Sequence, residues 1–428
     1  MRYMRDWIIT LLIFLFAPYS IPYADTETYG YPISNPYEAT IIGTPGPLQA
    51  DLPDKINIQP LELIVFEDRE IPEILWYTKG LEYSLASQEQ PAPLVFAISG
   101  TGSSANAPGM QILQKALFQA GFHVLSLPSP THPDFVTSAS TNAVPGHIVK
   151  DSADLYRVMQ LAWNQVRDDI EVTDFYLTGY SLGGAQAAFV SRLDDKKQIF
   201  NFKKVLMINP PVNLYNSVSI LDKLLANNIP GGMDNLNDFI NRVIDRFTEI
   251  YRTEQQVEFN DEFLYKAYQK YQPSKETLAA VIGLSFRWAA ANMIFVSDVI
   301  TNSGYVKPKN LKLSLTDSLT NYFKVSLRIG FLDYFNEYLF PFFEARYPDL
   351  TRKQLTHSLS LKSIEEYLRE SDTIAMVTNE DDPILAPGEL EYLREVFQSR
   401  AKIYPRGGHL GNMAYKDNVA YMVNFFLN

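Results

Sequence analysis

The sequence of 428 residues contains no cysteine. This absence excludes disulfide bonds, thiolate metal ligands, a cysteine nucleophile and a lipid anchor attached to cysteine. It is compatible with an oxidising compartment but does not require one.

Basic residues and histidines are also scarce. Lys and Arg total 37 against 49 Asp and Glu, which gives a net charge of −12, and the basic residues form no run. A nucleic-acid-binding surface therefore has no basis in the sequence, and we expect no nucleic-acid partner. The five histidines show no H-E-x-x-H or comparable ligand spacing, so we expect neither a metal nor another cofactor. They are His123, His132, His147, His357 and His409.

The remaining composition is typical of a folded globular protein. Hydrophobic residues make up 46% of the chain and charged residues 20%, so a large core can form. The length permits two or three domains, or one enlarged α/β domain with an insertion.

The first 60 residues differ from the rest. Arg2 and Arg5 precede a nearly continuous apolar stretch over residues 7–17, which is typical of an export signal and short for a membrane span. We expect residues 1–24 to be a signal peptide cleaved after Ala24, or an uncleaved anchor that holds the protein to a membrane. The first alternative predicts a periplasmic or secreted protein. Residues 25–60, rich in proline and tyrosine, predict an extended, weakly structured lead-in.

The most informative stretch is a G-x-S-x-G motif at residues 179–183, with Ser181 at its centre. An apolar run precedes it and a helix-compatible run follows it, which is the context of a nucleophile elbow. Glycines on both sides leave room for neighbouring backbone, and the helix N-terminus favours developing negative charge. The pentapeptide alone is equally typical of an ordinary glycine-rich turn.

Strand and helix patterns alternate around this motif. We predict strands at residues 61–66, 74–78, 93–98, 122–127 and 203–209, with amphipathic helices between the later ones. Alternation of this kind predicts a parallel sheet with right-handed crossovers. The small, glycine-rich loop at residues 99–104 follows a central strand. It lacks the Gly-Lys-Ser/Thr of a phosphate loop, which leaves a plain turn or a loop that brings its backbone close to a ligand.

Helical patterns dominate residues 211–371. The clearest are at residues 235–253, 276–300 and 313–345, and the last is rich in aromatic residues. The aromatic residues indicate helical core packing, a cap over an apolar substrate pocket, or both on different helix faces. We predict that part of residues 322–343 overhangs Ser181. The aromatic side chains are Tyr322, Phe323, Phe331, Tyr334, Phe335, Tyr338, Phe340, Phe342 and Phe343.

The C-terminal part restores the strand pattern at residues 373–378 and 401–404. The acidic pair Asp381 and Asp382 follows the first of these strands, and His409 follows the second in a glycine-flanked loop. Loops after parallel strands meet at the carboxyl edge of the sheet, where ligands bind. The chain order serine, aspartate, histidine is the order of an α/β-hydrolase triad.

With these motifs the chain resembles the α/β-hydrolase superfamily over residues 61–210 and 372–428, with residues 211–371 as an inserted helical cap. The Asp-Asp-Pro and Gly-Gly-His-x-Gly segments are similar to those of the bacterial YheT-like group. One departure is Ser99-Gly100, where many members have His-Gly. The resemblance implies an α/β-hydrolase fold: a mostly parallel, doubly wound sheet with the cap inserted before the acid-bearing strand.

The resemblance also implies residue roles. Ser181 would be the nucleophile, His409 the base, and Asp382 the acid, because the residue before Pro383 matches the acid of related hydrolases better than Asp381 does. The backbone N–H groups of Thr101 and Leu182 would form the oxyanion hole. Candidate pocket residues are Gly100, Gly102, Tyr180 and His132.

These roles predict a serine hydrolase that cleaves a small-molecule or lipid-like carboxylic ester through an acyl-enzyme. The aromatic cap favours an esterase or lipase for apolar acyl groups. A thioesterase, an amidase or an acyltransferase would use the same triad, because the triad sets the class of chemistry and the pocket sets the substrate. A membrane-held binding protein on a hydrolase scaffold is the alternative from another functional class.

Overall fold

A computed structural model describes residues 29–253 and 268–428. The predicted signal segment, residues 1–24, lies outside the described residues. Eight strands form one sheet in the order β1-β2-β4-β3-β5-β6-β7-β8. They are β1 (Gln59–Leu63), β2 (Leu81–Ala86), β3 (Ala92–Ile98), β4 (His123–Leu127), β5 (Val172–Tyr180), β6 (Lys204–Ile208), β7 (Ile374–Asn379) and β8 (Ala401–Tyr404).

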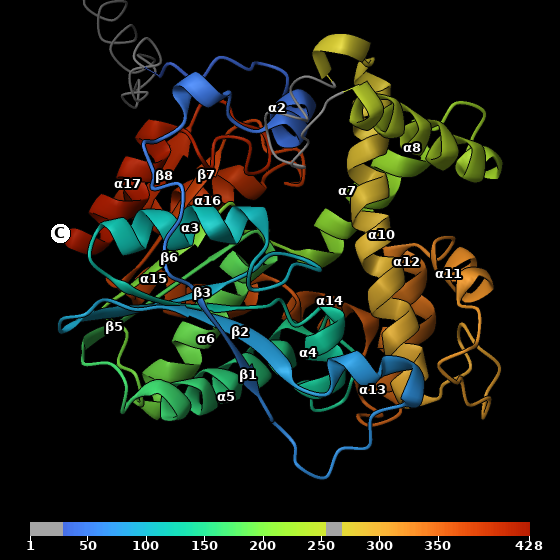
Figure 1. The fold of residues 1–428 in the computed structure, drawn as a ribbon, viewed down its shortest axis with the longest axis horizontal. Helices are drawn as coiled ribbons and strands as arrows, with labels where there is room; N and C mark the ends of the chain where they lie inside the picture. The colour runs from blue at the N-terminus through green and yellow to red at the C-terminus, as the bar shows by residue number, and fades with distance from the viewer. Residues whose placement is uncertain (1–28, 254–267) are drawn as a thin grey trace, which may run out of the picture.

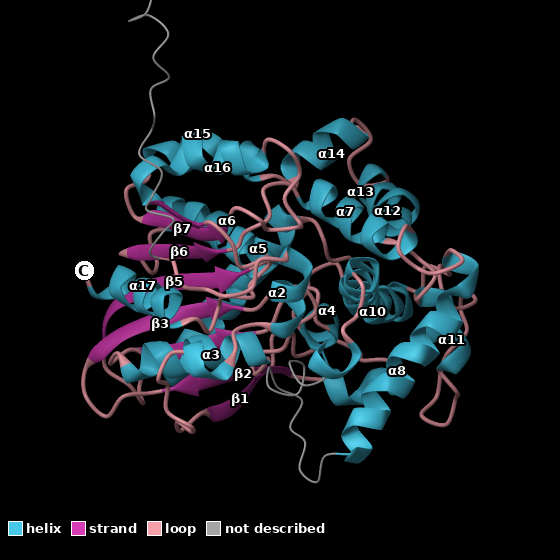
Figure 2. Ribbon diagram, turned by 90° about the horizontal axis from the view of Figure 1, so that it is seen from above, coloured by secondary structure: helices cyan, strands magenta, loops and turns pink. Residues whose placement is uncertain are grey.

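The sheet is mostly parallel, as the alternating pattern predicts. β2 runs antiparallel to both of its neighbours, and the remaining pairs, from β4 across to β8, are parallel. The central strand β3 pairs with β4 and β5. Its sequence, Ala-Pro-Leu-Val-Phe-Ala-Ile, is entirely apolar because both of its faces are covered. Figure 2 shows the strands side by side with the helical insertion beyond one end of the sheet.

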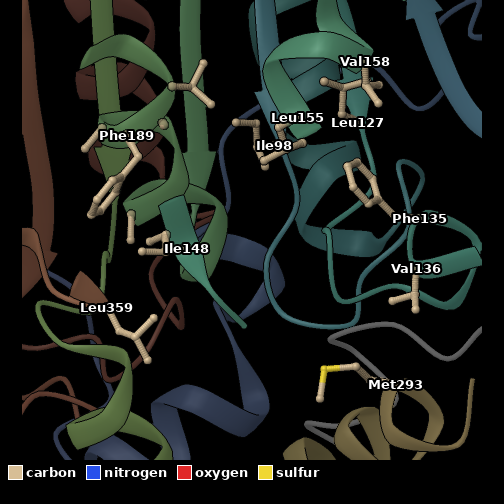
Figure 3. Close-up of a cluster of buried hydrophobic side chains, with 14 of the residues drawn as sticks. Ile98, Leu127, Phe135, Val136, Ile148, Leu155, Val158, Phe189, Met293 and Leu359 are labelled. Carbon is tan, nitrogen blue, oxygen red and sulfur yellow. The ribbon is translucent and has the colours of Figure 1, made fainter. Parts of the chain in front are cut away.

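Helices cover both faces of the sheet, which makes it doubly wound (Figure 1). One face carries α3 (Pro108–Gln119) and α17 (Lys416–Leu427), and the other carries α5 (Ile148–Val166) and α6 (Leu182–Lys197). The core on the α5 and α6 side continues into the insertion. Figure 3 shows Ile98, Leu127 and Leu155 of this core together with Met293 and Leu359, which belong to the insertion between β6 and β7.

The described chain between β6 and β7 is mostly helical. Its longest helix, α10 (Lys275–Thr301), stands beside the sheet with the shorter helices around it (Figure 1). Within the part of the chain that the structure describes, α10 is the one helix apolar and long enough to cross a bilayer, and about two thirds of its most apolar stretch is buried inside the protein. The others are α7 (Leu214–Ala226), α8 (Leu236–Thr253), α11 (Thr320–Ser326), α12 (Phe331–Tyr334), a π-helical turn (Phe335–Leu339), α13 (Phe340–Glu344), α14 (Arg352–Ser358) and α15 (Glu365–Glu370).

Shorter elements complete the described chain. They are α2 (Pro36–Ile42), α4 (Pro133–Ser138), α16 (Glu389–Phe397) and the 3₁₀ turns Gly46–Leu48, Glu73–Thr78, Met233–Asn235, Leu361–Ile364 and Gln398–Arg400.

Two element predictions are wrong. Residues 74–78 form a 3₁₀ turn instead of a strand, with Trp76 and Tyr77 exposed, and the strand is β2, which the pattern missed. Local β-propensity was misleading there because no partner strand covers these side chains. Residues 313–345 do not form one helix either. Helix α11 ends at Ser326, and Gly330 precedes α12, so the helical pattern is interrupted between them. From Phe331 the helix continues through the π-helical turn and past Pro341 to Glu344.

The lead-in is more structured than predicted. Residues 36–42 form α2, which begins after Asn35, whose side-chain oxygen accepts hydrogen bonds from the N–H groups of Tyr37 and Glu38. Tyr31, Ala39 and Ile42 are fully buried. The prolines and tyrosines that suggested an extended segment instead start a helix and fill a core between the sheet and the C-terminal loops.

Candidate active site

Ser181 lies in a strained turn between β5 and α6. Its φ of 55° and ψ of −125° are unfavourable for a residue with a side chain. The flanking glycines permit the turn: a Cβ on Gly179 would lie 2.3 Å from the Gly183 carbonyl oxygen, and one on Gly183 would lie 2.3 Å from the Ile98 carbonyl oxygen. The turn therefore presents the Ser181 hydroxyl at the carboxyl edge of the sheet, as in a nucleophile elbow.

The structure brings Ser181, His409 and Asp382 together in one hydrogen-bonded chain. The His409 Nε2 atom lies 2.9 Å from Ser181 Oγ. The His409 Nδ1 atom lies 2.9 Å from Asp382 Oδ2 and 3.1 Å from Oδ1. All three residues are buried, between 4% and 6% exposed. An imidazole that donates Nδ1–H to the carboxylate leaves Nε2 free to accept the hydroxyl proton.

The two neighbouring aspartates have different partners. Besides His409, Asp382 accepts a hydrogen bond from the Asn209 side chain to Oδ2 at 2.9 Å, and one from the Ile384 N–H to Oδ1 at 3.1 Å. Asp381 instead accepts the Gly408 N–H at 2.9 Å. Asp381 is partly buried, and burial raises the pKa of its carboxyl. Asp382 orients His409, and Asp381 holds the loop that carries it.

Ser181 follows β5, the acidic pair follows β7, and His409 follows β8, all at one edge of a sheet in which β2 alone runs against the rest. This is the α/β-hydrolase fold. The fold class expected from the sequence is confirmed, with the helical insertion between β6 and the acid-bearing β7.

No protein family model and no curated protein matches the chain. Solved structures are similar in outline. A thioesterase domain from the curacin biosynthetic pathway is 14% identical, with a TM-score of 0.39 over 87% of this chain and 100% of its own. The esterase PF2001 of Pyrococcus furiosus is 10% identical, with a TM-score of 0.42 over 89% and 96%. Carboxyl esterase 2 of Tuber melanosporum is 15% identical, with a TM-score of 0.41 over 88% and 87%. Similarity at this level carries no conclusion about activity.

An apolar cavity of about 90 Å³ opens onto Ser181. Of the aromatic residues predicted for the cap at residues 322–343, Phe331, Tyr334 and Phe335 line it, so part of the cap lies over the nucleophile. Tyr338 does not line the cavity, because its hydroxyl lies against the hydroxyls of Ser297 and Thr301. The lining from other elements includes Leu182, Leu214, Tyr215, Val218, Leu221, Phe286, Met293, Leu359 and Ile384.

The predicted oxyanion residues both reach this cavity. Leu182 is the first residue of α6, where a backbone N–H has no partner within the helix. Thr101 lines the cavity from the loop after β3. The next N–H along that loop, from Gly102, donates to Thr131 Oγ1 at 2.8 Å. Thr101 is therefore better placed than Gly102 to donate to an oxyanion.

Gly100, Gly102 and Tyr180, which are predicted to line the pocket, are not among the residues that line it. A Cβ on Gly100 would lie 2.9 Å from the Tyr180 ring and 3.2 Å from Ser181 Cβ, and one on Gly102 would lie 2.7 Å from Ala289. Gly100 thus allows close packing between Tyr180 and Ser181, and Gly102 allows close packing against α10.

His132 does not line the cavity either, although its neighbour Thr131 does. Its Nδ1 atom accepts the Asp134 N–H at 3.3 Å and so caps α4. Burial lowers the pKa of His132 to about 4, so the ring is neutral near pH 7. The loop that contains His132 does lie at the cavity, through Thr131, but the His132 side chain caps the N-terminus of α4.

The loop that carries His409, residues 406–412 (the histidine loop), is held by the N-terminal segment, and no pattern in the sequence predicts this contact. The His409 N–H donates to Thr40 Oγ1 at 2.9 Å, and the Thr40 hydroxyl donates to the Pro36 carbonyl. A Cβ on Gly408 would lie 2.3 Å from the same carbonyl oxygen. The Thr44 hydroxyl donates to the Gly411 carbonyl at 2.9 Å. Helix α2 and the residues after it therefore fix the backbone on both sides of His409.

Buried amides fix the loop from the sheet side. The Asn379 side chain donates to the Gly408 carbonyl at 2.8 Å and pairs with the side chain of Asn412, which in turn donates to the Tyr29 hydroxyl. Asn379 is the last residue of β7 and Asn412 the last residue of the histidine loop, so the sequence patterns locate both residues, but no local pattern predicts that they pair.

Within residues 29–253 and 268–428, no group of acidic or histidine side chains could hold a metal ion.

Proposed function

We propose that the protein is a serine hydrolase that cleaves carboxylic esters through an acyl-enzyme. The observation that carries this proposal is the buried chain of hydrogen bonds from Asp382 through His409 to Ser181, at a strained turn beside an apolar cavity. Nucleophile, base and orienting acid in this arrangement constitute a catalytic triad by geometry.

The distances support a specific order of proton transfers. His409 Nε2 takes the Ser181 hydroxyl proton as Oγ attacks the acyl carbon. The N–H groups of Thr101 and Leu182 stabilise the developing oxyanion. His409 then gives the proton to the departing alcohol. A water molecule, activated by the same imidazole, releases the acid and restores Ser181.

The cavity supports an apolar acyl group as the preferred substrate part. Its wall is built from leucine, methionine and aromatic side chains, and burying one such contact against substrate is worth about 1.5–3 kcal/mol. An esterase or lipase acting on a small-molecule or lipid-like ester fits this wall best, whereas thioesters, amides and acyl transfer use the same triad. Kinship with the YheT-like group is part of the proposal and is supported by the Asp-Asp-Pro and Gly-Gly-His segments.

We also propose that the protein is exported to the periplasm or beyond, with membrane retention if residues 1–24 are not removed. The support is the pair Arg2 and Arg5 before the apolar stretch at residues 7–17. Sequencing the mature N-terminus tests this: a start near Asp25 supports cleavage, and an intact N-terminus contradicts it.

Hydrolysis of p-nitrophenyl esters by wild-type protein and Ser181→Ala tests the proposed chemistry. We expect kcat to fall on the order of 10⁴-fold in the variant while its fold is retained, because the nucleophile is lost. Turnover by Ser181→Ala at the wild-type rate would refute the mechanism.

A further inference from the structure

A second hollow lies directly outside the catalytic cavity. It is a surface depression of about 380 Å³ between the start of α7 and helix α14. Tyr215 and Phe335 line both hollows. Their ring centroids are 4.9 Å apart in an edge-to-face arrangement. One layer of side chains, this ring pair, therefore separates the Ser181 cavity from the outer depression.

The outer depression is basic. Arg352, Lys353 and His357 line it from α14, and no acidic side chain is among its lining residues. All three are exposed. Among the ion pairs between described residues, none includes any of them. Arg352 and Lys353 thus place two cations without an acidic partner in one depression, in a chain with a net charge of −12.

Arg352 is already held in place at this site. Its Nη1 atom donates to the Asn336 side-chain oxygen at 3.3 Å, and its guanidinium lies 4.2 Å from the centroid of the Phe340 ring. A guanidinium fixed in this way loses less freedom when it binds a carboxylate or phosphate. Asn336 and Phe335 belong to the π-helical turn, and such turns occur frequently at functional sites.

The inner cavity is too small to hold a long substrate. Its volume of about 90 Å³ is below the roughly 150 Å³ of an apolar protein cavity that binds benzene. A longer acyl chain must therefore extend beyond the cavity, and one route leads past the ring pair of Tyr215 and Phe335. Beyond these rings it meets the basic depression.

We propose that the depression binds an anionic group, a carboxylate or a phosphate, at the far end of the ester substrate. The apolar part of the substrate then lies along Tyr215 and Phe335, with the scissile ester at Ser181. This inference rests on the proposed ester hydrolysis and names its substrate class: apolar esters with an anionic terminus.

Matched p-nitrophenyl esters test the inference. Each neutral alkanoate is compared with the ester of the same chain length that ends in a carboxylate, for chains of increasing length. We expect kcat/KM to favour the carboxylate ester by about five- to tenfold at low salt, at the length that spans the two hollows. The preference should shrink as salt screens the exposed cations.

Charge reversal locates the effect. Lys353→Glu should abolish the preference for the carboxylate ester, measured as the ratio of the two kcat/KM values within the same variant. Arg346→Glu is the matched control, because Arg346 is an exposed cation near α14 that does not line the depression. Its ratio should stay at the wild-type value. Arg352→Ala should also lower the ratio. If Arg352→Ala does not fold because the contact with Phe340 is lost, Lys353→Glu still tests the site.

Binding to Ser181→Ala separates this inference from the proposed function. The same ester pair bound to the inactive protein should show the same preference in Kd without turnover, and inorganic phosphate should compete with the carboxylate ester if the depression also accepts phosphate. A wild-type enzyme that hydrolyses both esters equally at every length overturns the anion site and leaves the hydrolase standing. Equal loss of the preference in Arg346→Glu and Lys353→Glu also overturns the site.

Discussion

At the residue scale, Asp381 and Asp382 are adjacent in the chain but have different hydrogen-bond partners and therefore different roles. Asp382 contacts the His409 Nδ1 atom directly, and Asn209 and the Ile384 N–H fix its carboxylate. Asp381 reaches only the backbone of the same loop, at Gly408. One aspartate therefore sets the tautomer of the imidazole, and the other supports its position.

Asparagine at each position separates these roles. We expect Asp382→Asn to lower kcat by on the order of 10³–10⁴, because the amide favours the wrong imidazole tautomer. Asp381→Asn should lower kcat by about tenfold or less, since its amide oxygen still accepts the Gly408 N–H. Steady-state kinetics of the two purified variants decides the matter. A larger loss in Asp381→Asn would exchange the two assignments.

At the scale of elements, the described N-terminal segment supports the candidate active site. Helix α2 contacts the histidine loop through Thr40 and packs on α10, whose residues Phe286 and Met293 line the cavity. Arg406, at the start of the histidine loop, donates to the carbonyls of Tyr29 and Tyr31. The segment thus joins the catalytic loop to the cap.

Removal of the Thr40 hydroxyl tests this role. Thr40→Val keeps the shape but leaves the His409 N–H without an acceptor, which costs about 1–3 kcal/mol for a buried group. We expect kcat to fall about tenfold or more with little change in KM, and Thr40→Ser to restore it. A drop in thermal stability with unchanged kcat would mean that Thr40 supports only the fold.

Two aromatic residues of the π-helical turn at Phe335–Leu339 have different neighbours. Phe335 faces the cavity, whereas Tyr338, three residues on, faces Ser297 and Thr301 of α10. Both are buried, at 5% and 7% exposed. Loss of either side chain should therefore destabilise the protein, but only one change enlarges the cavity.

We expect Phe335→Ala to shift the ester preference toward longer acyl chains by about tenfold in relative kcat/KM. Tyr338→Ala is the matched control and should keep the wild-type preference. A series of p-nitrophenyl esters of increasing length measures both. If the two variants give the same chain-length profile, Phe335 does not limit the acyl group.

At the scale of the whole molecule, a buried carboxyl links stability to pH. Asp151, in the first turn of α5, is 3% exposed and accepts the Gly146 N–H at 2.8 Å. Burial raises the pKa of Asp151 well above the ordinary value of 3.8. Its contribution to stability is therefore full below pH 3.8 and is lost as pH rises through the pKa in the folded state.

Asp151→Asn removes this dependence and keeps an oxygen for the Gly146 N–H. We expect the variant to match wild type near pH 4 and to gain at least about 1 kcal/mol over it by pH 7, since each unit of pKa shift is worth about 1.4 kcal/mol. Denaturant unfolding across this pH range measures the difference, with Asp168→Asn as a control at a side chain that is 93% exposed. A difference that does not change with pH would contradict the raised pKa.

The sequence predicts the parts of this molecule that depend on local pattern. The elbow at Ser181, the strands that lead to Asp382 and His409, and the long α10 all follow from periodicity and turn chemistry. The errors arise where distant partners decide. Residues 74–78 lack a partner strand, the helical pattern is interrupted between Ser326 and Phe331, and Thr40 contacts His409 across 369 positions in the chain.

Local sequence pattern also does not determine which side chains line the cavity. His132 and Thr131 are adjacent, yet only Thr131 faces the cavity, because His132 caps α4. Likewise Phe335 and Tyr338 belong to one aromatic run, but Phe335 lines the cavity and Tyr338 contacts Ser297 and Thr301. Which side of a loop or turn points inward depends on the elements packed against it.

The central claim is that Ser181 is an activated nucleophile, and covalent labelling with a fluorophosphonate measures this most directly. The geometry predicts that the wild-type protein forms one adduct, that peptide mass spectrometry locates it on Ser181, and that Ser181→Ala forms none while remaining folded. An unlabelled wild-type protein, or a Ser181→Ala protein labelled to the same extent, would contradict it.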